Sequence, residues 1–260
     1  MKLVDSHSHL FLEEFADDVS EVMNRALEAG VSHIFMPNID STTLEPLLKV
    51  CSSYPDLCYP MIGLHPTSVD GNYQKELEIV HQQLLQPRAD FVAIGEIGLD
   101  LYWDQTFLQE QLLVFEQQVK WALEFHLPVV IHCREAFPYI HKVLAPYKDS
   151  GLTGIFHSFT GNAEEAASML EFSGFMIGIN GVVTFKKSAI PAVLPEIPLE
   201  RLVLETDSPY LTPVPNRGKR NESAYVTYTA AKVAEVYGVP LQKVAEITSY
   251  NALKVFGRSK

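Results

Sequence analysis

Residues 1–10 read MKLVDSHSHL, a short apolar run that leads directly into the pair His7 and His9. In an extended strand, side chains at positions i and i+2 share a face, so the two imidazoles would point the same way. Imidazole binds zinc, iron, nickel and copper, so the pair predicts a metal-binding strand end without naming the metal. A short polar turn near the N-terminus is the alternative interpretation of an isolated pair. The metal hypothesis requires further ligands from distant parts of the sequence.

The rest of the chain alternates short apolar or β-branched runs with longer segments of helical periodicity. Strands are predicted at residues 2–6, 32–37, 58–64, 91–95, 128–132, 153–157, 175–179 and 201–205. The clearest helices between and after them cover residues 17–29, 106–125, 163–172, 224–237 and 241–256. Eight β–α alternations predict an α/β fold, a (β/α)8 TIM barrel that occupies residues 1–260 as a single domain.

A doubly wound open sheet is the rival architecture. Such a sheet usually carries a glycine-rich phosphate loop after its first strand, and here the His-x-His pair follows that strand instead. The proline-rich residues 207–215 are expected to form an ordered loop over the mouth of the barrel. The barrel is therefore the preferred prediction.

Composition narrows the class of protein. The chain has 260 residues, 47% of them hydrophobic, which is enough for a large core. Three cysteines without CxxC spacing argue against a disulfide framework and fit a reducing cytoplasm. No run resembles a signal peptide or reaches the roughly 20 apolar residues of a membrane helix, so we expect a cytoplasmic protein without membrane contact. A formal net charge of −12 disfavours general nucleic-acid binding, but it still allows an enzyme that meets a phosphate at a metal-loaded pocket.

In a TIM barrel, the carboxyl ends of all strands meet at one mouth, where active sites lie. Polar residues that follow the predicted strands are therefore the candidate ligands: His7, His9, His65, Glu96, His132, His157, Glu205 and Asp207. Each one alone is a weak signal, because a histidine at the end of an apolar strand is more often a satisfied residue at the core edge. Their joint position at one end of the strands predicts a metal site at the C-terminal face.

The expected order of strands around the barrel suggests how these residues divide. His7 and His9, with Asp207 from the neighbouring last strand, could hold one ion, while His132 and His157 could hold a second. Glu96 could bridge both ions with its two oxygens, at the roughly 3.5–4 Å spacing of two-metal hydrolases. A water between the ions would become the nucleophile, and a carboxylate such as Glu205 would orient a ligand histidine.

Six short motifs occur in a fixed order: His7-Ser8-His9, Gly63-Leu64-His65-Pro66, Gly95-Glu96-Ile97-Gly98-Leu99-Asp100, Ile131-His132-Cys133-Arg134, His157-Ser158-Phe159-Thr160-Gly161 and Glu205-Thr206-Asp207-Ser208-Pro209-Tyr210-Leu211. Together they resemble the signatures of the TatD family of metal-dependent deoxyribonucleases in the amidohydrolase superfamily. The resemblance spans residue 5 to about residue 226. It implies a TIM barrel, two divalent ions (Mg, Mn or Zn) and phosphodiesterase activity on DNA, often as an exonuclease working from the 3′ end.

The resemblance also implies roles for single residues. The implied metal ligands are His7, His9, Glu96, His132, His157 and Asp207. Asp207 would also orient the attacking water as a catalytic base, Glu205 would assist it, and His65 would contact the phosphate or donate a proton.

Two further segments are candidates for substrate contacts. Residues 213–222 resemble the family's basic loop, which makes Arg217 and Lys219 candidate phosphate contacts; an exposed salt-bridged turn is the alternative. Tyr102 and Trp103 could stack on an unpaired base, and simple packing is the alternative there. Thr67, Leu101, Asn216 and Ser223 depart from the usual family pattern, which puts substrate choice in question but touches no ligand.

These observations favour a deoxyribonuclease that acts on single-stranded DNA ends, with RNA as a further candidate substrate. A hydrolase of lactones, amides or phosphotriesters on the same barrel is the alternative, although many such enzymes bridge their metals with a carboxylated lysine and Glu96 stands at the fourth strand here. A scaffold that had lost catalysis would lack ligands, and all six are present. No obligate protein partner is expected.

Overall fold

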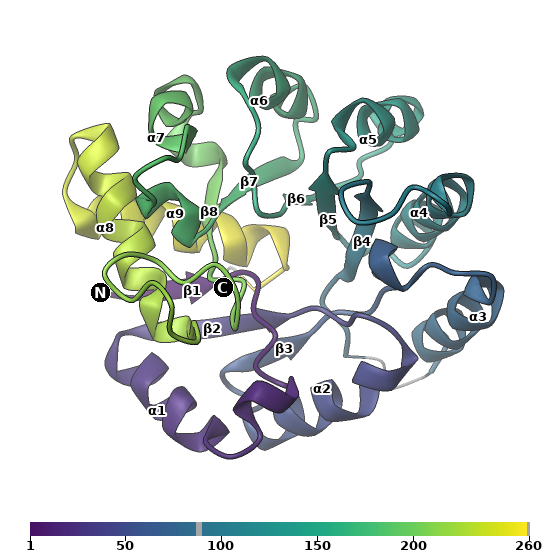
Figure 1. Ribbon diagram of the computed structural model, residues 1–260, viewed down its shortest axis with the longest axis horizontal. Coiled ribbons are helices and arrows are strands. Elements are labelled where there is room, and N and C mark those ends of the chain that lie inside the picture. The colour runs from purple at the N-terminus through teal and green to yellow at the C-terminus, as the bar shows by residue number, and fades with distance from the viewer. Residues whose placement is uncertain (87–89, 259–260) are drawn as a thin grey trace.

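The computed structural model describes residues 1–86 and 90–258, in which strands and helices alternate (Figure 1). The strands in these residues are β1 (Leu3–Asp5), β2 (Val31–Met36), β3 (Cys58–Pro60), β4 (Ile94–Asp100), β5 (Val129–Arg134), β6 (Gly154–Phe156), β7 (Phe175–Ile179) and β8 (Leu202–Leu204). The α-helices are α1 (Val19–Glu28), α2 (Ser41–Ser53), α3 (Tyr73–Leu84), α4 (Leu108–Glu124), α5 (Phe137–Leu144), α6 (Ala163–Leu170), α7 (Ile190–Val193), α8 (Val226–Tyr237) and α9 (Leu241–Val255). No helix in this part of the chain is long and apolar enough to cross a membrane.

The strands pair in parallel and in chain order, as the alternation predicts. Two continuous ladders, β1-β2-β3 and β4-β5-β6-β7-β8, are joined at both ends by single parallel bridges. One bridge pairs Ile62 with Ile94, and the other pairs Ser8 with Ser208. Figure 1 shows α1 to α6 around the outside of the strands. The architecture is therefore the predicted α/β barrel, closed by two bridges instead of by full ladders.

Alternation along the strands separates an apolar layer from the polar layer above it. One buried cluster takes a side chain from nearly every strand, as expected for the interior of a barrel: Val4, Phe35, Met61, Val130, Ile155, Met176 and Val203. Phe256, which follows α9, stacks on Phe35 with ring centroids 3.8 Å apart. Two residues further along four of these strands, on the same face, come His132, His157, Gly178 and Glu205. The apolar interior thus forms the floor of the polar site.

Two strand boundaries differ from the prediction in a way that affects the site. The fourth strand runs over Ile94–Asp100 instead of 91–95, so Glu96 lies within β4 and not after it. The β4–β5 ladder continues past a bulge between Ile94 and Ile97. Gly98 has a φ of 137° and packs so closely on β5 that a Cβ would collide with the carbonyl oxygen of His132. Glycines such as Gly95 and Gly98 often mark the end of a strand. Here they lie within β4 and allow it to pack closely against β5. The third strand is shorter than predicted and ends at Pro60.

The five helices named from periodicity are present as α1, α4, α6, α8 and α9, with ends shifted by a few residues. The prediction did not single out α2, α3 or α5. In α2 the buried stripe consists of only Leu44, Leu47 and Cys51, and the helix contains Pro46, which weakened the periodic signal. A capping box formed by Asp40 and Thr43 starts this helix in spite of the proline.

Candidate metal centre

A cavity of about 670 Å³ opens at the carboxyl ends of the strands. Its walls include His9, His65, Glu96, His132, His157 and Asp207. His7 is fully buried and contacts these residues from below the cavity surface. The structure therefore brings all six proposed metal ligands, together with His65, into one place, although they come from segments up to 200 residues apart.

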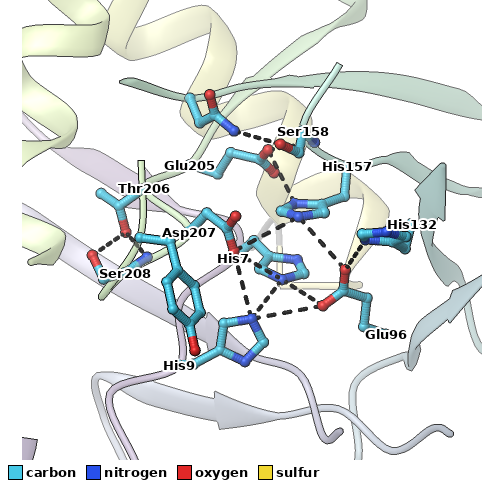
Figure 2. Close-up of polar contacts among 12 residues, drawn as sticks. His7, His9, Glu96, His132, His157, Ser158, Glu205, Thr206, Asp207 and Ser208 are labelled. Atoms are coloured by element: carbon cyan, nitrogen blue, oxygen red, sulfur yellow. Dashed lines mark hydrogen bonds and ion pairs between the residues drawn. The ribbon is translucent and has the colours of Figure 1, made fainter. Parts of the chain in front are cut away.

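One group of donors surrounds the paired histidines of the first strand (Figure 2). The Nε2 atoms of His7 and His9 lie 3.2 Å from each other. Oε2 of Glu96 lies 3.1 Å from the first and 3.6 Å from the second, and Oδ1 of Asp207 lies 3.8 and 3.5 Å from them. Nitrogen lone pairs and carboxylate oxygens that converge on one point make a donor set that fits a divalent cation. His7, His9 and Asp207 form such a group.

A second group of donors surrounds the other oxygen of Glu96. Its Oε1 lies 2.9 Å from Nδ1 of His132, 3.6 Å from Nε2 of His157 and 3.4 Å from Nε2 of His65. Each Glu96 oxygen thus faces a different cluster of imidazoles, as expected for a carboxylate between two cations. His65, Glu96 and His132 meet the distance criteria of a metal site, as do His7, His157 and Glu205.

The backbone explains how Asp207 reaches the first group. Its φ is 58°, in the left-handed region, where aspartate is one of the few residues found regularly. Its N–H donates to the carbonyl of His7 at 2.9 Å. One residue earlier, Asp5 accepts the N–H of Thr206 at 2.9 Å and its hydroxyl at 2.6 Å. Asp5 also accepts the hydroxyl of Ser223 at 2.6 Å, so a buried carboxyl group fastens the segment that carries Asp207 to the strand that precedes His7.

Two more carboxylates hold the histidines of the second group from behind. Nε2 of His132 lies 2.9 Å from Oδ2 of Asp100, and Nδ1 of His157 lies 3.0 Å from Oε1 of Glu205. The same Glu205 oxygen accepts the N–H of Ser158 at 2.6 Å. Glu205 is fully buried and lies outside the cavity wall, so its contacts fit a residue that orients His157 better than one that touches a substrate.

The prediction missed Asp5 and Asp100. Asp100 could have been found, because Glu96, Gly98 and Asp100 alternate along one face of β4. A strand that is predicted to end at Gly95 does not include this alternation. Asp5 precedes the His-x-His pair directly, but nothing in the sequence indicates its bonds to Thr206 and Ser223, about 200 residues away.

His65 differs from the other imidazoles of the site. Its Nδ1 accepts the backbone N–H of Thr67 at 3.1 Å, which places the ring proton on Nε2. Burial lowers the pKa of His65, which favours the neutral ring, and its Nε2 lies at the cavity wall, 3.4 Å from Oε1 of Glu96. That geometry fits the expected hydrogen-bond donor to a phosphate.

Burial and neighbouring charges act in opposite directions on the pKa values of His132, His157 and Glu96. Burial alone would lower the pKa of His132, but hydrogen bonds to Asp100 and Glu96 raise it to about 9. Burial likewise opposes protonation of His157, but Glu205, Glu96 and Asp207 raise its pKa to about 10. Burial would raise the pKa of Glu96, but the surrounding imidazoles hold it well below its usual range. The carboxylates therefore need positive charge beside them, which protons or divalent cations can supply.

Of the four predicted substrate contacts, Trp103 lines this cavity, and Arg217, Lys219 and Tyr102 lie outside its wall. Arg217 and Lys219 are exposed, and the Arg217 guanidinium packs over the ring of Phe185 at 3.8 Å. The nearby Arg220 forms an ion pair with Asp18, with Nη2 at 2.6 Å from Oδ2. Tyr102 is half exposed, and the guanidinium of Arg134 lies 3.9 Å from its ring centre.

The fold and the site define a class of protein, a barrel hydrolase with histidine and carboxylate donors at its C-terminal face. A family model described as TatD related DNase matches residues 4–257. The chain belongs to this family of metal-dependent hydrolases. The family expected from the sequence motifs is thereby confirmed.

Individual relatives match over almost their whole length. An uncharacterised metal-dependent hydrolase of Bacillus subtilis is 38% identical, with 98% of each chain covered. A protein of Pectobacterium parmentieri named 3′-5′ ssDNA/RNA exonuclease TatD is 34% identical over 98% of this chain and 99% of its own. Among solved structures, the TatD homologue YjjV of Escherichia coli superposes with a TM-score of 0.91 at 28% identity over 98% of both chains. An amidohydrolase from Saccharomyces cerevisiae, at 21% identity and a TM-score of 0.83, shares the fold.

Proposed function

We propose that this protein is an exonuclease that hydrolyses phosphodiester bonds at single-stranded ends of DNA, and of RNA as a second substrate, with two divalent cations at the site. The observation that carries the proposal is the placement of Glu96 between two groups of imidazoles, one carboxylate oxygen toward each. Relatives named 3′-5′ ssDNA/RNA exonuclease, at 33–34% identity, support the choice of substrate.

The proposed division assigns the ligands to two cations. His7, His9 and Asp207 would hold one cation, His132 and His157 would hold the other, and Glu96, with one carboxylate oxygen toward each group, would contribute to both. Cations bound there would supply Lewis-acid charge to the phosphoryl group and would lower the pKa of water near them. The imidazoles of this donor set favour zinc, whereas its carboxylates favour magnesium and manganese, so all three metals are included in the test.

The remaining roles, which are proton transfer, phosphate binding and orientation of the ligands, are assigned to residues of the chain. Asp207 reaches into the cavity and accepts a proton from the attacking water. His65 donates its Nε2–H to a non-bridging phosphate oxygen. Asp100 and Glu205 keep His132 and His157 in fixed orientations through the ring nitrogens that face away from Glu96. Arg217 and Lys219, on the exposed loop, are the proposed contacts to phosphates further along the strand.

The test is digestion of end-labelled single-stranded and duplex oligonucleotides, of DNA and of RNA, by protein stripped with chelator and then given magnesium, manganese or zinc in turn. We expect stepwise shortening of single strands from the 3′ end, loss of activity with chelator, and a decrease of about 10²–10⁴-fold for Asp207→Asn. The proposal fails if metal-loaded protein leaves every oligonucleotide intact. Turnover of lactones or amides under the same conditions, without cleavage of nucleic acid, would assign the site to small molecules instead.

A further inference from the structure

Three planar side chains pack together beside the cavity, where the loop after β4 meets the end of β5. The guanidinium of Arg134, the last residue of β5, lies 3.9 Å from the ring centre of Tyr102 and 5.2 Å from that of Trp103. The two rings meet edge to face, with centroids 4.8 Å apart and an interplanar angle of 86°. Trp103 and Arg134 line the cavity that contains Glu96 and His132, and Tyr102 lies outside that wall. Tyr102 therefore supports Arg134, while the other two face the cavity.

The exposure and charge of these residues are unusual for a purely structural cluster. Trp103 is 71% exposed, whereas Trp121, the other tryptophan of the chain, is 7% exposed and stacks on His81. Arg134 is exposed and forms no ion pair within residues 1–86 and 90–258, in a chain whose net charge is −12. An indole face and an uncompensated guanidinium are thus presented together to the wall of the site.

An aromatic face beside a planar cation is the chemistry that binds a nucleobase. Bases stack on aromatic rings and on arginine planes whatever their sequence, and the positive charge of arginine attracts the phosphate that accompanies the base. A base within a duplex has both faces covered by its neighbours, so only an unpaired base can occupy such a surface.

We propose that Trp103 and Arg134 form a nucleobase-binding subsite that receives an unpaired base close to the scissile phosphate, with Tyr102 as the positioning residue for Arg134. This inference rests on the proposed nuclease function and deepens it, because the subsite makes the enzyme select single strands. Of the two aromatic residues that the sequence offers for stacking, it keeps Trp103 as the base contact and gives Tyr102 a supporting position.

The first experiment compares kinetics on single-stranded DNA with abasic residues placed one at a time near the 3′ end. Wild-type protein should lose affinity at one abasic position, and Trp103→Leu should raise KM on intact DNA by roughly 5- to 150-fold with kcat nearly unchanged. For Trp103→Leu, an abasic residue at that position should change KM little further, because the indole on which the base would stack is already absent. Trp103→Phe should restore most of the affinity, and Tyr250→Leu, which removes an exposed aromatic from α9, is the matched control.

The second experiment measures binding without turnover. With chelator present, a short oligothymidylate should quench the fluorescence of wild-type protein, which has one exposed tryptophan, while an abasic oligomer of the same length should not. The subsite is refuted if wild-type protein digests single strands while Trp103→Leu and every abasic substrate leave KM unchanged. If digestion fails altogether, the nuclease proposal falls, and the fluorescence titration then decides the subsite: quenching by the base-bearing oligomer alone supports it, and equal responses to both refute it.

Discussion

His132 lies between two carboxylates, with Nε2 at 2.9 Å from Oδ2 of Asp100 and Nδ1 at 2.9 Å from Oε1 of Glu96. If Nε2 carries the proton, Nδ1 keeps its lone pair toward the cavity, which is the arrangement a metal-binding imidazole needs. Asp100 is itself held by Gln111, whose side chain accepts the Asp100 N–H at 3.0 Å and donates to its carbonyl at 3.3 Å. The chain from Gln111 through Asp100 thus sets the ring orientation of a proposed ligand.

Replacing Asp100 should therefore weaken metal binding without removing a ligand. For Asp100→Ala we expect an affinity for manganese or zinc lower by roughly 10–100-fold, because His132 loses the partner that fixes its proton and its orientation. Asp100→Asn, whose amide oxygen can still accept, should have a smaller effect. Calorimetric titration of metal into stripped protein measures both. Asp149→Asn removes an exposed carboxylate and is the control; equal affinities for all three variants and wild type would refute the role of Asp100.

Gly178 leaves the space in which Glu205 sits. A Cβ at this position would lie 2.6 Å from Oε2 of Glu205, too close for the carboxylate to stay where it contacts His157. Gly178→Ala should displace Glu205 and lower the pKa of His157, which now stands near 10 because of Glu205, Glu96 and Asp207 against the opposing effect of burial.

The measurement is an NMR titration of the His157 ring in metal-free protein, together with metal affinity. Gly71→Ala is a matched control, because a Cβ there meets no atom within 4 Å. An unchanged His157 titration in Gly178→Ala would show that Glu205 adapts and that the close approach has no consequence.

The positions of the main donors could be predicted from the sequence, because the carboxyl ends of all strands in a barrel lie at the same face. Strand order places His7 and His9 beside Asp207, and His132 beside His157, at the same mouth of the barrel. The supports of the site could not be read in this way. Asp5 reaches Thr206 and Ser223 only because the first and last strands meet through Ser8 and Ser208, a contact of tertiary structure without a local pattern. The barrel closes through single bridges at Ile62–Ile94 and Ser8–Ser208. The periodicity of the sequence does not predict which residues form these bridges.

Removal of both histidines of the first pair tests the division into two metal sites. His7→Ala/His9→Ala should bind one equivalent of metal where wild type binds two, because His132, His157 and Glu96 remain in place. Elemental analysis after dialysis gives the stoichiometry. A control that replaces His81 and His141, which lie on helices outside the site, should keep both equivalents. Full occupancy in the first variant, or complete loss, would contradict the proposed division.

Asp5 should make the stability of the metal-free protein depend on pH. Burial raises the pKa of Asp5 from 3.8 to about 7, against the opposing effect of hydrogen bonds from Ser223, Thr206 and His7. A carboxyl group whose pKa is higher in the folded state favours folding when protonated. Its contribution is complete below the unfolded pKa of 3.8 and is lost as pH rises through about 7.

Chemical denaturation of stripped protein at several pH values isolates this effect through Asp5→Asn, which is neutral throughout. The amide fits the same place, because the hydroxyls of Thr206 and Ser223 can rotate to accept from it. Between about pH 5 and pH 7, wild type should lose roughly 2 kcal/mol of unfolding free energy relative to Asp5→Asn. Asp149→Asn should follow wild type at every pH. Parallel curves for wild type and Asp5→Asn would mean that Asp5 is already ionised at the lower pH, held so by its four hydrogen-bond donors.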